Sequence, residues 1–242
     1  MKYLRWAGAV TALIFLVGFC APVSADKPQP QMVDSGSFGI FVQGRRVATE
    51  TFQITAQADG SHARAEFKTT EGSSIQTSDL LLHPNGDLRR YEWREQEKAK
   101  VVVELKNEFV VETITLSDSP KPTEVPFLLS ASTAVVDDNF FIHRQILAWK
   151  YIRTGCAPGT DTPQGCVLQR TQFGVIMPQQ QRPAVISMEF TGKETLKLAG
   201  GERKLRRFKL ETEGVEWALW LDEQHKMVRV LIASQNIEVL RD

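Results

Sequence analysis

Few residues of this chain have the types and the spacing that catalysis requires. The four histidines (His62, His83, His143 and His225) are scattered, and no pair has the spacing of metal ligands. The sequence contains no Gly-x-Ser-x-Gly motif for a nucleophilic serine, no phosphate-binding P-loop and no Rossmann glycine pattern. We therefore expect no catalytic residue, no metal site and no cofactor, and the sequence favours a protein that is not an enzyme.

Two side chains keep an enzymatic alternative open. Glu50 lies on the same strand face as Phe52 and Ile54. Its carboxyl group is either an inward acid or ligand anchor with a raised pKa, or a strand-end group in water. His143 follows two aspartates and precedes Arg144. A His–Asp pair is one interpretation, and the sequence favours the other, an exposed histidine in the first helical turns.

The first 25 residues are typical of a signal peptide. Lys2 and Arg5 form a short basic region, an apolar stretch covers Trp6–Cys20, and small residues precede the bond after Ala25. The apolar stretch is shorter than the roughly 20 residues that span a bilayer. We expect cleavage after Ala25 and a periplasmic chain that is not an integral membrane protein. An uncleaved N-terminal anchor is the alternative.

The two cysteines that remain after cleavage are Cys156 and Cys166. Each follows a glycine, and the residues between them are rich in Pro, Gly and Thr. In an oxidising compartment such a pair predicts a structural disulfide, because a metal site would need further ligands and a redox pair usually reads Cys-x-x-Cys.

The rest of the chain alternates apolar and polar residues with a period of two, broken by turn signals such as Pro84-Asn85-Gly86-Asp87. A polar leader is expected over residues 26–35 and a single domain over 36–242. Ser117–Pro126, with three prolines, is expected to interrupt the strands. The predicted strands are Gly36–Val42, Arg45–Ala56, Ala63–Lys68, Ile75–His83, Leu88–Glu97, Lys100–Lys106, Glu108–Thr115, Val167–Met177, Ala184–Phe190, Glu194–Leu198, Lys204–Thr212, Val215–Leu221, Lys226–Ala233 and Asn236–Arg241.

One helix is predicted over about residues 137–152. Asp137 and Asp138 would cap it, and Ile142, Ile146 and Trp149 would form its apolar stripe. In Val215–Leu221 both faces are apolar, which predicts a strand covered on both sides, with this helix on the second face. The fold class is therefore mainly β, a large curved antiparallel sheet or unclosed β-barrel wrapped around an α-helix.

Composition excludes several function classes. The 242 residues include 29 Lys and Arg against 29 Asp and Glu, and 42% are hydrophobic. A balanced charge gives no case for nucleic-acid binding, since the acids in Arg89–Lys98 cancel its bases. These proportions also exclude a disordered protein and a polytopic membrane protein.

Two stretches carry a family resemblance: Phe38–Glu50 (FGIFVQGRRVATE), and Trp217–Leu231 (WALWLDEQHKMVRVL) followed by Ile237–Arg241. They resemble uncharacterised exported proteins of the bacterial envelope, whose expected shape is similar to the lipoprotein-carrier LolA/LolB-like fold. The resemblance implies an unclosed β-barrel with helices over its concave face, and it brings no catalytic residues. A lipoprotein carrier would show several lid helices, whereas this sequence predicts one.

Two functional hypotheses remain. In the first, a non-enzymatic periplasmic protein binds a lipid or another apolar or amphiphilic ligand between sheet and helix, in a pocket lined by aromatic groups with a few polar anchors. A helix packed without a gap would make the same residues simple core. In the second, an envelope assembly factor contacts protein partners through sheet edges or loops. The candidate ligand-binding residues are Glu50, Phe52, Phe67, Trp93, Phe141, Trp149 and Trp217.

Overall fold

The computed structural model describes residues 30–130, 132–155, 168–198 and 200–242. The expected signal peptide and the Cys156–Cys166 pair lie outside these residues. The strands are β1 (Gln31–Val42), β2 (Arg45–Gln57), β3 (Gly60–Thr69), β4 (Ile75–Leu82), β5 (Leu88–Glu95), β6 (Ala99–Lys106), β7 (Phe109–Leu116), β8 (Ser119–Phe127), β9 (Ala134–Val135), β10 (Thr171–Met177), β11 (Arg182–Leu198), β12 (Gly201–Thr212), β13 (Val215–Leu221), β14 (Met227–Ile232) and β15 (Ile237–Arg241). The helix α1 covers Ile142–Gly155, and short 3-10 turns cover η2 (Pro178–Gln180) and η3 (Ala233–Gln235).

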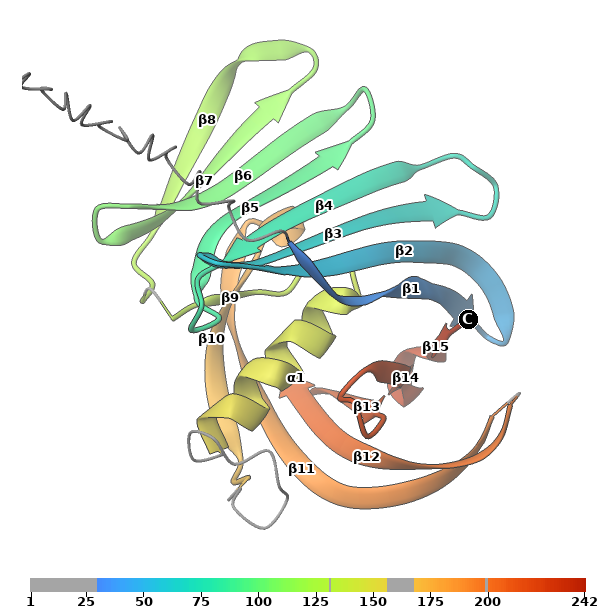
Figure 1. Cartoon of the computed structure of the whole chain (residues 1–242). Coiled ribbons are helices and arrows are strands. Elements are labelled where there is room, and N and C mark those ends of the chain that lie inside the picture. Colours follow the sequence, from blue (N-terminus) through green and yellow to red (C-terminus); the bar gives the residue numbers. More distant parts are fainter. Residues whose placement is uncertain (1–29, 131, 156–167, 199) are drawn as a thin grey trace, which may run out of the picture.

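Among the described residues, all fifteen strands belong to one sheet, in the order β8 down to β1 and then β15 down to β9. Neighbours in this order pair antiparallel, except that the short β9 is parallel to β10. The pair β1–β15 joins the two halves. The sheet curls around α1 without closing (Figure 1). Its β9 end lies near β5, so that β6–β8 extend past it. The predicted mainly β fold, an unclosed sheet around one helix, is confirmed.

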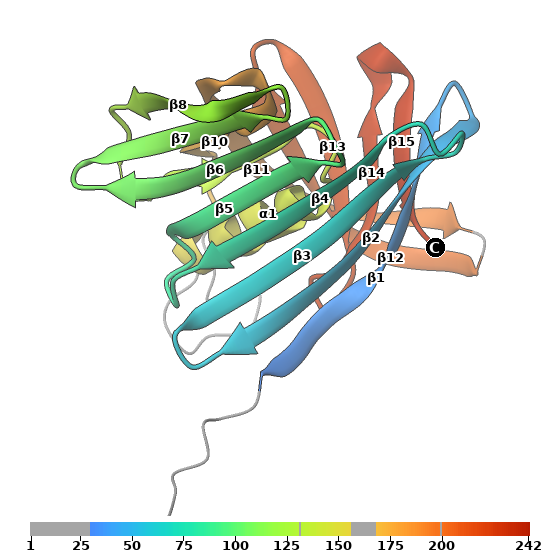
Figure 2. The ribbon, with the colours of Figure 1, turned by 90° about the horizontal axis from the view of Figure 1, so that it is seen from above.

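Alternation along the strands places the apolar side chains on the concave side. In β3, Ala63, Ala65 and Phe67 are buried, while Arg64 and Lys68 are exposed. Residues of this inner face form one continuous core with α1, which lies behind the sheet in the view of Figure 2. The alternation of apolar and polar residues therefore predicted both the strands and the face of each strand that is buried.

Three predicted boundaries are wrong. β1 begins at Gln31, so the second half of the expected leader is a strand paired with β2. Ala184–Phe190 and Glu194–Leu198 are parts of the single strand β11, which continues through a bulge at Gly192. The proline-rich segment forms the edge strand β8. An edge strand tolerates proline because the missing N–H would face away from the sheet.

The helix begins later than predicted. Asp137 and Asp138 precede α1 by four residues or more, and the first turn of α1 contains no acidic residue. The buried side of α1 also differs from the predicted stripe, because it includes His143 and Arg144. His143 is therefore not an exposed residue. Charged and polar residues usually lie on the solvent-exposed face of a helix. For α1 this rule gives the wrong face, because His143 and Arg144 are buried.

The strand β13 is covered on both faces, as predicted, but by different partners. Leu219 and Leu221 belong to the inner core with α1. Ala218 and Trp220 belong to a second cluster, in which Leu196 and Leu198 from the far part of β11 take part. The helix thus covers one face only.

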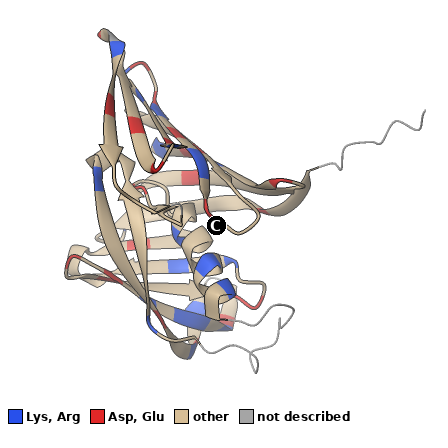
Figure 3. Cartoon of the chain, turned by 90° about the vertical axis from the view of Figure 1, so that its left-hand side faces the viewer, with Lys and Arg blue, Asp and Glu red and all other residues tan. Residues whose placement is uncertain are grey.

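Acidic and basic residues are both spread over the ribbon (Figure 3).

Candidate functional site

The N-terminus of α1 is held by a side chain from the sheet. Glu50 points inward from β2, as the alternation with Phe52 requires, and is fully buried. Its Oε2 accepts a hydrogen bond of 2.7 Å from the backbone N–H of Phe141, and its Oε1 accepts one of 3.2 Å from Ile142. Burial raises the pKa of Glu50 to about 8, against the lowering effect of these two donors. Glu50 thus replaces the predicted cap, since free N–H groups at a helix start need acceptors.

Asp137 lies beside this helix start and is bound by Tyr91. The Tyr91 hydroxyl donates to Asp137 Oδ2, and the Asp138 backbone N–H donates to Asp137 Oδ1 over 2.9 Å. Burial raises the pKa of Asp137 to about 6. Burial, together with the nearby Asp137, also raises the pKa of Tyr91 well above its ordinary value. Tyr91 is therefore a fixed donor and not a proton source at neutral pH.

Arg144 is the buried cation of this cluster, with 1% of its surface exposed. Its Nη1 donates to the backbone carbonyls of Asp137 and Phe140. The guanidinium carbon lies 4.4 Å from the ring centre of Trp217 and 5.0 Å from that of Phe141. Burial lowers the pKa of Arg144 to about 10, so the group stays charged at neutral pH.

His143 connects the helix to β4. Its Nδ1 accepts a hydrogen bond of 3.2 Å from the Asp137 backbone N–H, so the ring proton is on Nε2, which lies 2.9 Å from Ser78 Oγ. Burial, and then the charge of Arg144, lowers the pKa of His143 to about 3. A neutral imidazole with both nitrogens hydrogen-bonded thus connects α1 to β4 and to the backbone before the helix.

Gln145 connects the helix to both halves of the sheet. Its Nε2 donates to Asp34 Oδ2 in β1 over 2.8 Å, and its Oε1 accepts a 2.6 Å hydrogen bond from the Met227 backbone in β14. Asp34 also binds Arg241 in β15 at 2.6 Å, and Lys226 lies 3.3 Å from it. Burial would raise the pKa of Asp34, but hydrogen bonds from Arg241 and Gln145 outweigh it and lower that pKa.

Another buried carboxyl group lies on β7. Glu112 faces inward across β6, opposite Val103, which in turn pairs with Tyr91. Neither carboxyl oxygen of Glu112 has a hydrogen-bond partner among the described residues. Burial, and then the charge of Asp137, raises the pKa of Glu112 to about 7. Burial thus raises the pKa of Glu50, Asp137 and Glu112 alike, which favours the protonated form of these carboxyl groups.

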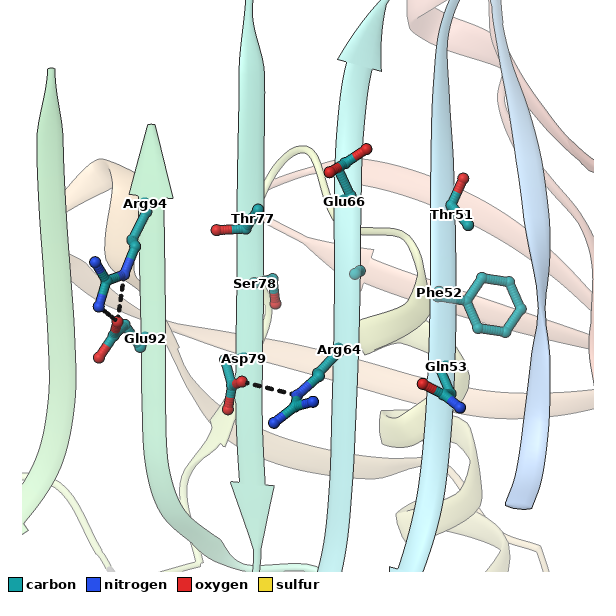
Figure 4. Close-up of a pocket in the computed structure, with 11 residues that line it drawn as sticks. Thr51, Phe52, Gln53, Arg64, Glu66, Thr77, Ser78, Asp79, Glu92 and Arg94 are labelled. Atoms are coloured by element: carbon teal, nitrogen blue, oxygen red, sulfur yellow. Dashed lines mark hydrogen bonds and ion pairs between the residues drawn. The ribbon is translucent and has the colours of Figure 1, made fainter. Parts of the chain in front are cut away.

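A pocket lies elsewhere, on the outer face of β2–β5. It is an open depression of about 590 Å³. Its charged groups are already paired, with Arg64 Nε 3.2 Å from Asp79 Oδ2 and Arg94 bound to Glu92 (Figure 4). It is lined by Thr51, Phe52, Gln53, Arg64, Ala65, Glu66, Thr77, Ser78, Asp79, Glu92 and Arg94.

The structure brings three of the predicted ligand residues together. Glu50, Phe141 and Trp217 all lie at the first turn of α1, and the alternative of Glu50 as a strand-end group in water is wrong. The others are distributed over the core. Phe52 stacks on Phe38 at 4.7 Å, Phe67 is buried, Trp93 donates to Gln76, and Trp149 donates to the backbone of His225.

Sequence reasoning missed Tyr91, Glu112, Asp137 and Arg144 as members of one cluster. One signal was present: Glu112 lies between Val110 and Ile114 at inward positions of an alternating strand.

The described residues contain no group of three or more His, Cys, Asp or Glu that could hold a metal ion. None of the described helices has the length and apolar character to cross a membrane.

Comparison with known proteins leaves this geometry as the main source of inference. No family model, curated protein or solved structure matches the chain. The proposals that follow rest on its own residues.

Proposed function

We propose that this protein is an exported, periplasmic, non-enzymatic protein that binds an apolar or amphiphilic molecule (a lipid or a lipoprotein-like ligand) between the sheet and α1. One observation carries the proposal. The helix that covers the concave face of an unclosed sheet is held there by polar side chains at three consecutive buried positions, His143, Arg144 and Gln145.

A helix that serves only as core would present apolar residues at such positions. Here His143 and Gln145 bind Ser78, Asp34 and Met227, which lie in three different strands. Water can replace these hydrogen bonds when the helix moves, because the net contribution of each is only about 0.5–1.5 kcal/mol. The apolar sheet surface under the helix cannot be covered by water at so small a cost. A hydrocarbon ligand would cover it.

The test is binding of N-phenyl-1-naphthylamine, a neutral apolar fluorescent probe, to the folded chain 26–242. We expect saturable fluorescence with about one probe per chain. Gln145→Ala removes contacts that hold α1 to β1 and β14, so it should speed up probe binding several-fold. Arg64→Ala, in the outer depression, is the matched control and should leave binding unchanged. Absence of saturable binding, or its loss in Arg64→Ala alone, contradicts the proposal.

The alternative function, an envelope assembly factor that acts through protein contacts, would be favoured by an uncharged exposed edge strand. The β8 edge carries Lys121, Glu124 and three prolines. The edge at β9 is two residues long. These features are typical of edges that resist strand addition, so the ligand-binding proposal has the better support.

A further inference from the structure

We propose that Arg144 and Trp217 form a head-group subsite that binds an acyl oxygen, the carboxylate or ester carbonyl at the end of a hydrocarbon chain. The inference deepens the function proposed above and rests on it. It names the chemical class of the ligand and the two residues that would recognise it.

The proposal rests on a set of buried N–H donors that have no acceptor among the described residues. Arg144 Nε, Arg144 Nη2 and Trp217 Nε1 are all buried, and none has a hydrogen-bond partner within the described part of the chain. The two side chains are in contact, with the guanidinium carbon 4.4 Å from the indole ring centre. Buried donors in folded proteins are almost always paired, and each unpaired one is costly. Unpaired donors on two touching side chains indicate an absent acceptor.

The acidic neighbours of Arg144 do not use these donors. Glu50, Asp137, Asp138 and Tyr91 all interact electrostatically with the guanidinium. The hydrogen bonds of Arg144 nevertheless go to the backbone carbonyls of Asp137 and Phe140, through Nη1 alone. The site therefore lacks an acceptor, such as an oxygen atom, for the unpaired N–H groups of Arg144 and Trp217. A cationic head group has no such acceptor and would be repelled by the guanidinium.

The surroundings of Trp217 suit the hydrocarbon part of such a ligand. Trp217 in β13 pairs with Leu210 in β12, which pairs with Met188 in β11, so the three side chains form one inward row. Leu210 and Met188 are buried in the core, and Trp217 is partly exposed at its border. An acyl chain that enters at Trp217 would meet apolar side chains beyond its polar end. This order of polar and apolar groups matches an amphiphile with one terminal oxygen group.

The experiment compares three ligands of equal chain length: palmitate, methyl palmitate and hexadecyltrimethylammonium. Their affinities are measured by displacement of N-phenyl-1-naphthylamine from the wild-type chain and two variants. Trp217→Phe keeps an aromatic ring against Arg144 and removes the indole N–H together with the five-membered ring that carries it. Trp220→Phe is the matched control, because its indole N–H donates to Glu194 on the other face of β13.

We expect Trp217→Phe to weaken palmitate or methyl palmitate about 5-fold, the effect of one hydrogen bond of ~1 kcal/mol, and to leave the ammonium ligand unchanged. A loss for palmitate alone identifies a free carboxylate, and a loss for both identifies an acyl carbonyl. Unchanged affinities in Trp217→Phe overturn the subsite while probe binding to the wild type still supports the proposed function. If no probe binds the wild type, the proposed function fails first.

Discussion

Glu50 in β2 binds the backbone N–H of Phe141, a residue 91 positions later in the chain. A helix normally satisfies its first N–H groups with its own cap residue. Here the sheet supplies the acceptor, so the first turn of α1 depends on a side chain of β2.

Removal of this acceptor should be costly. We expect Glu50→Ala to lower the free energy of unfolding by about 2–3 kcal/mol, because it leaves two buried N–H groups unpaired. Glu50→Gln retains a carbonyl acceptor and should cost less than Glu50→Ala. Urea unfolding monitored by circular dichroism measures both. Glu66→Ala, at a half-buried position on the outer face of β3, serves as control and should change stability by less than about 0.5 kcal/mol. Equal values for Glu66→Ala and Glu50→Ala would contradict the cap.

Stability should fall as the pH rises from 6.5 to 8. The raised pKa values of Glu50, Glu112 and Asp137 (about 8, 7 and 6) mean that the folded chain binds protons that the unfolded chain releases. Their stabilising effect is complete below the ordinary carboxyl pKa and is lost as the pH rises to the folded value. His143, with its pKa lowered to about 3, acts in the opposite direction, but only below its ordinary pKa of 6.5. Arg144 is charged throughout this interval.

Between pH 6.5 and 8 the carboxyl effects are therefore unopposed within the cluster, and we expect a loss of about 2 kcal/mol. Urea unfolding at the two pH values measures it. Glu50→Gln cannot titrate at this position and should reduce the loss. A wild-type stability that is constant or rises over the interval would show that these carboxyl groups ionise normally.

The hydroxyl of Tyr91 should matter most when Asp137 is ionised. We expect Tyr91→Phe to cost about 1–3 kcal/mol at pH 7.5, because it removes a donor from a buried carboxylate, and less at pH 5, where Asp137 is protonated. Tyr151→Phe is the comparison. Its hydroxyl accepts from the Phe190 backbone, so its cost should be the same at both pH values. A cost of Tyr91→Phe that is independent of pH would argue against ionised Asp137 as the acceptor.

Replacement of Glu112 should improve stability. Both of its oxygens are buried and have no hydrogen-bond partner among the residues that the structure describes, so an apolar side chain of similar size avoids a desolvation penalty. We expect Glu112→Leu to raise the free energy of unfolding by about 1 kcal/mol. Glu104→Leu, on the neighbouring strand, should stay within about 0.5 kcal/mol of the wild type. Destabilisation by Glu112→Leu would show that this carboxyl group makes a contact that supports the fold.

The sequence predicted the sheet well because alternation is a local property. Ala63, Ala65 and Phe67 are buried because each second residue of a strand faces the same side. It predicted the site poorly for a related reason. Arginine side chains are almost always exposed, so the sequence gives no reason to expect that Arg144 is buried. Its contact with Trp217 follows only from the packing of α1 against β13. The partners of Glu50 are likewise fixed by tertiary structure, which periodicity does not encode.

The strand pair β1–β15 also has a consequence for the order of folding. It joins the two halves of the sheet, and the Ser37–Asp242 hydrogen bond beside it spans 205 positions. During synthesis β1 can pair with β2 at once, but its other edge must wait until almost the whole domain has emerged. Contacts between such distant residues form slowly, because closing a long loop has an entropic cost. Until then the unpaired edge of β1 can pair with another chain. A chaperone that shields this edge until β15 pairs with it would therefore raise the yield of folded protein.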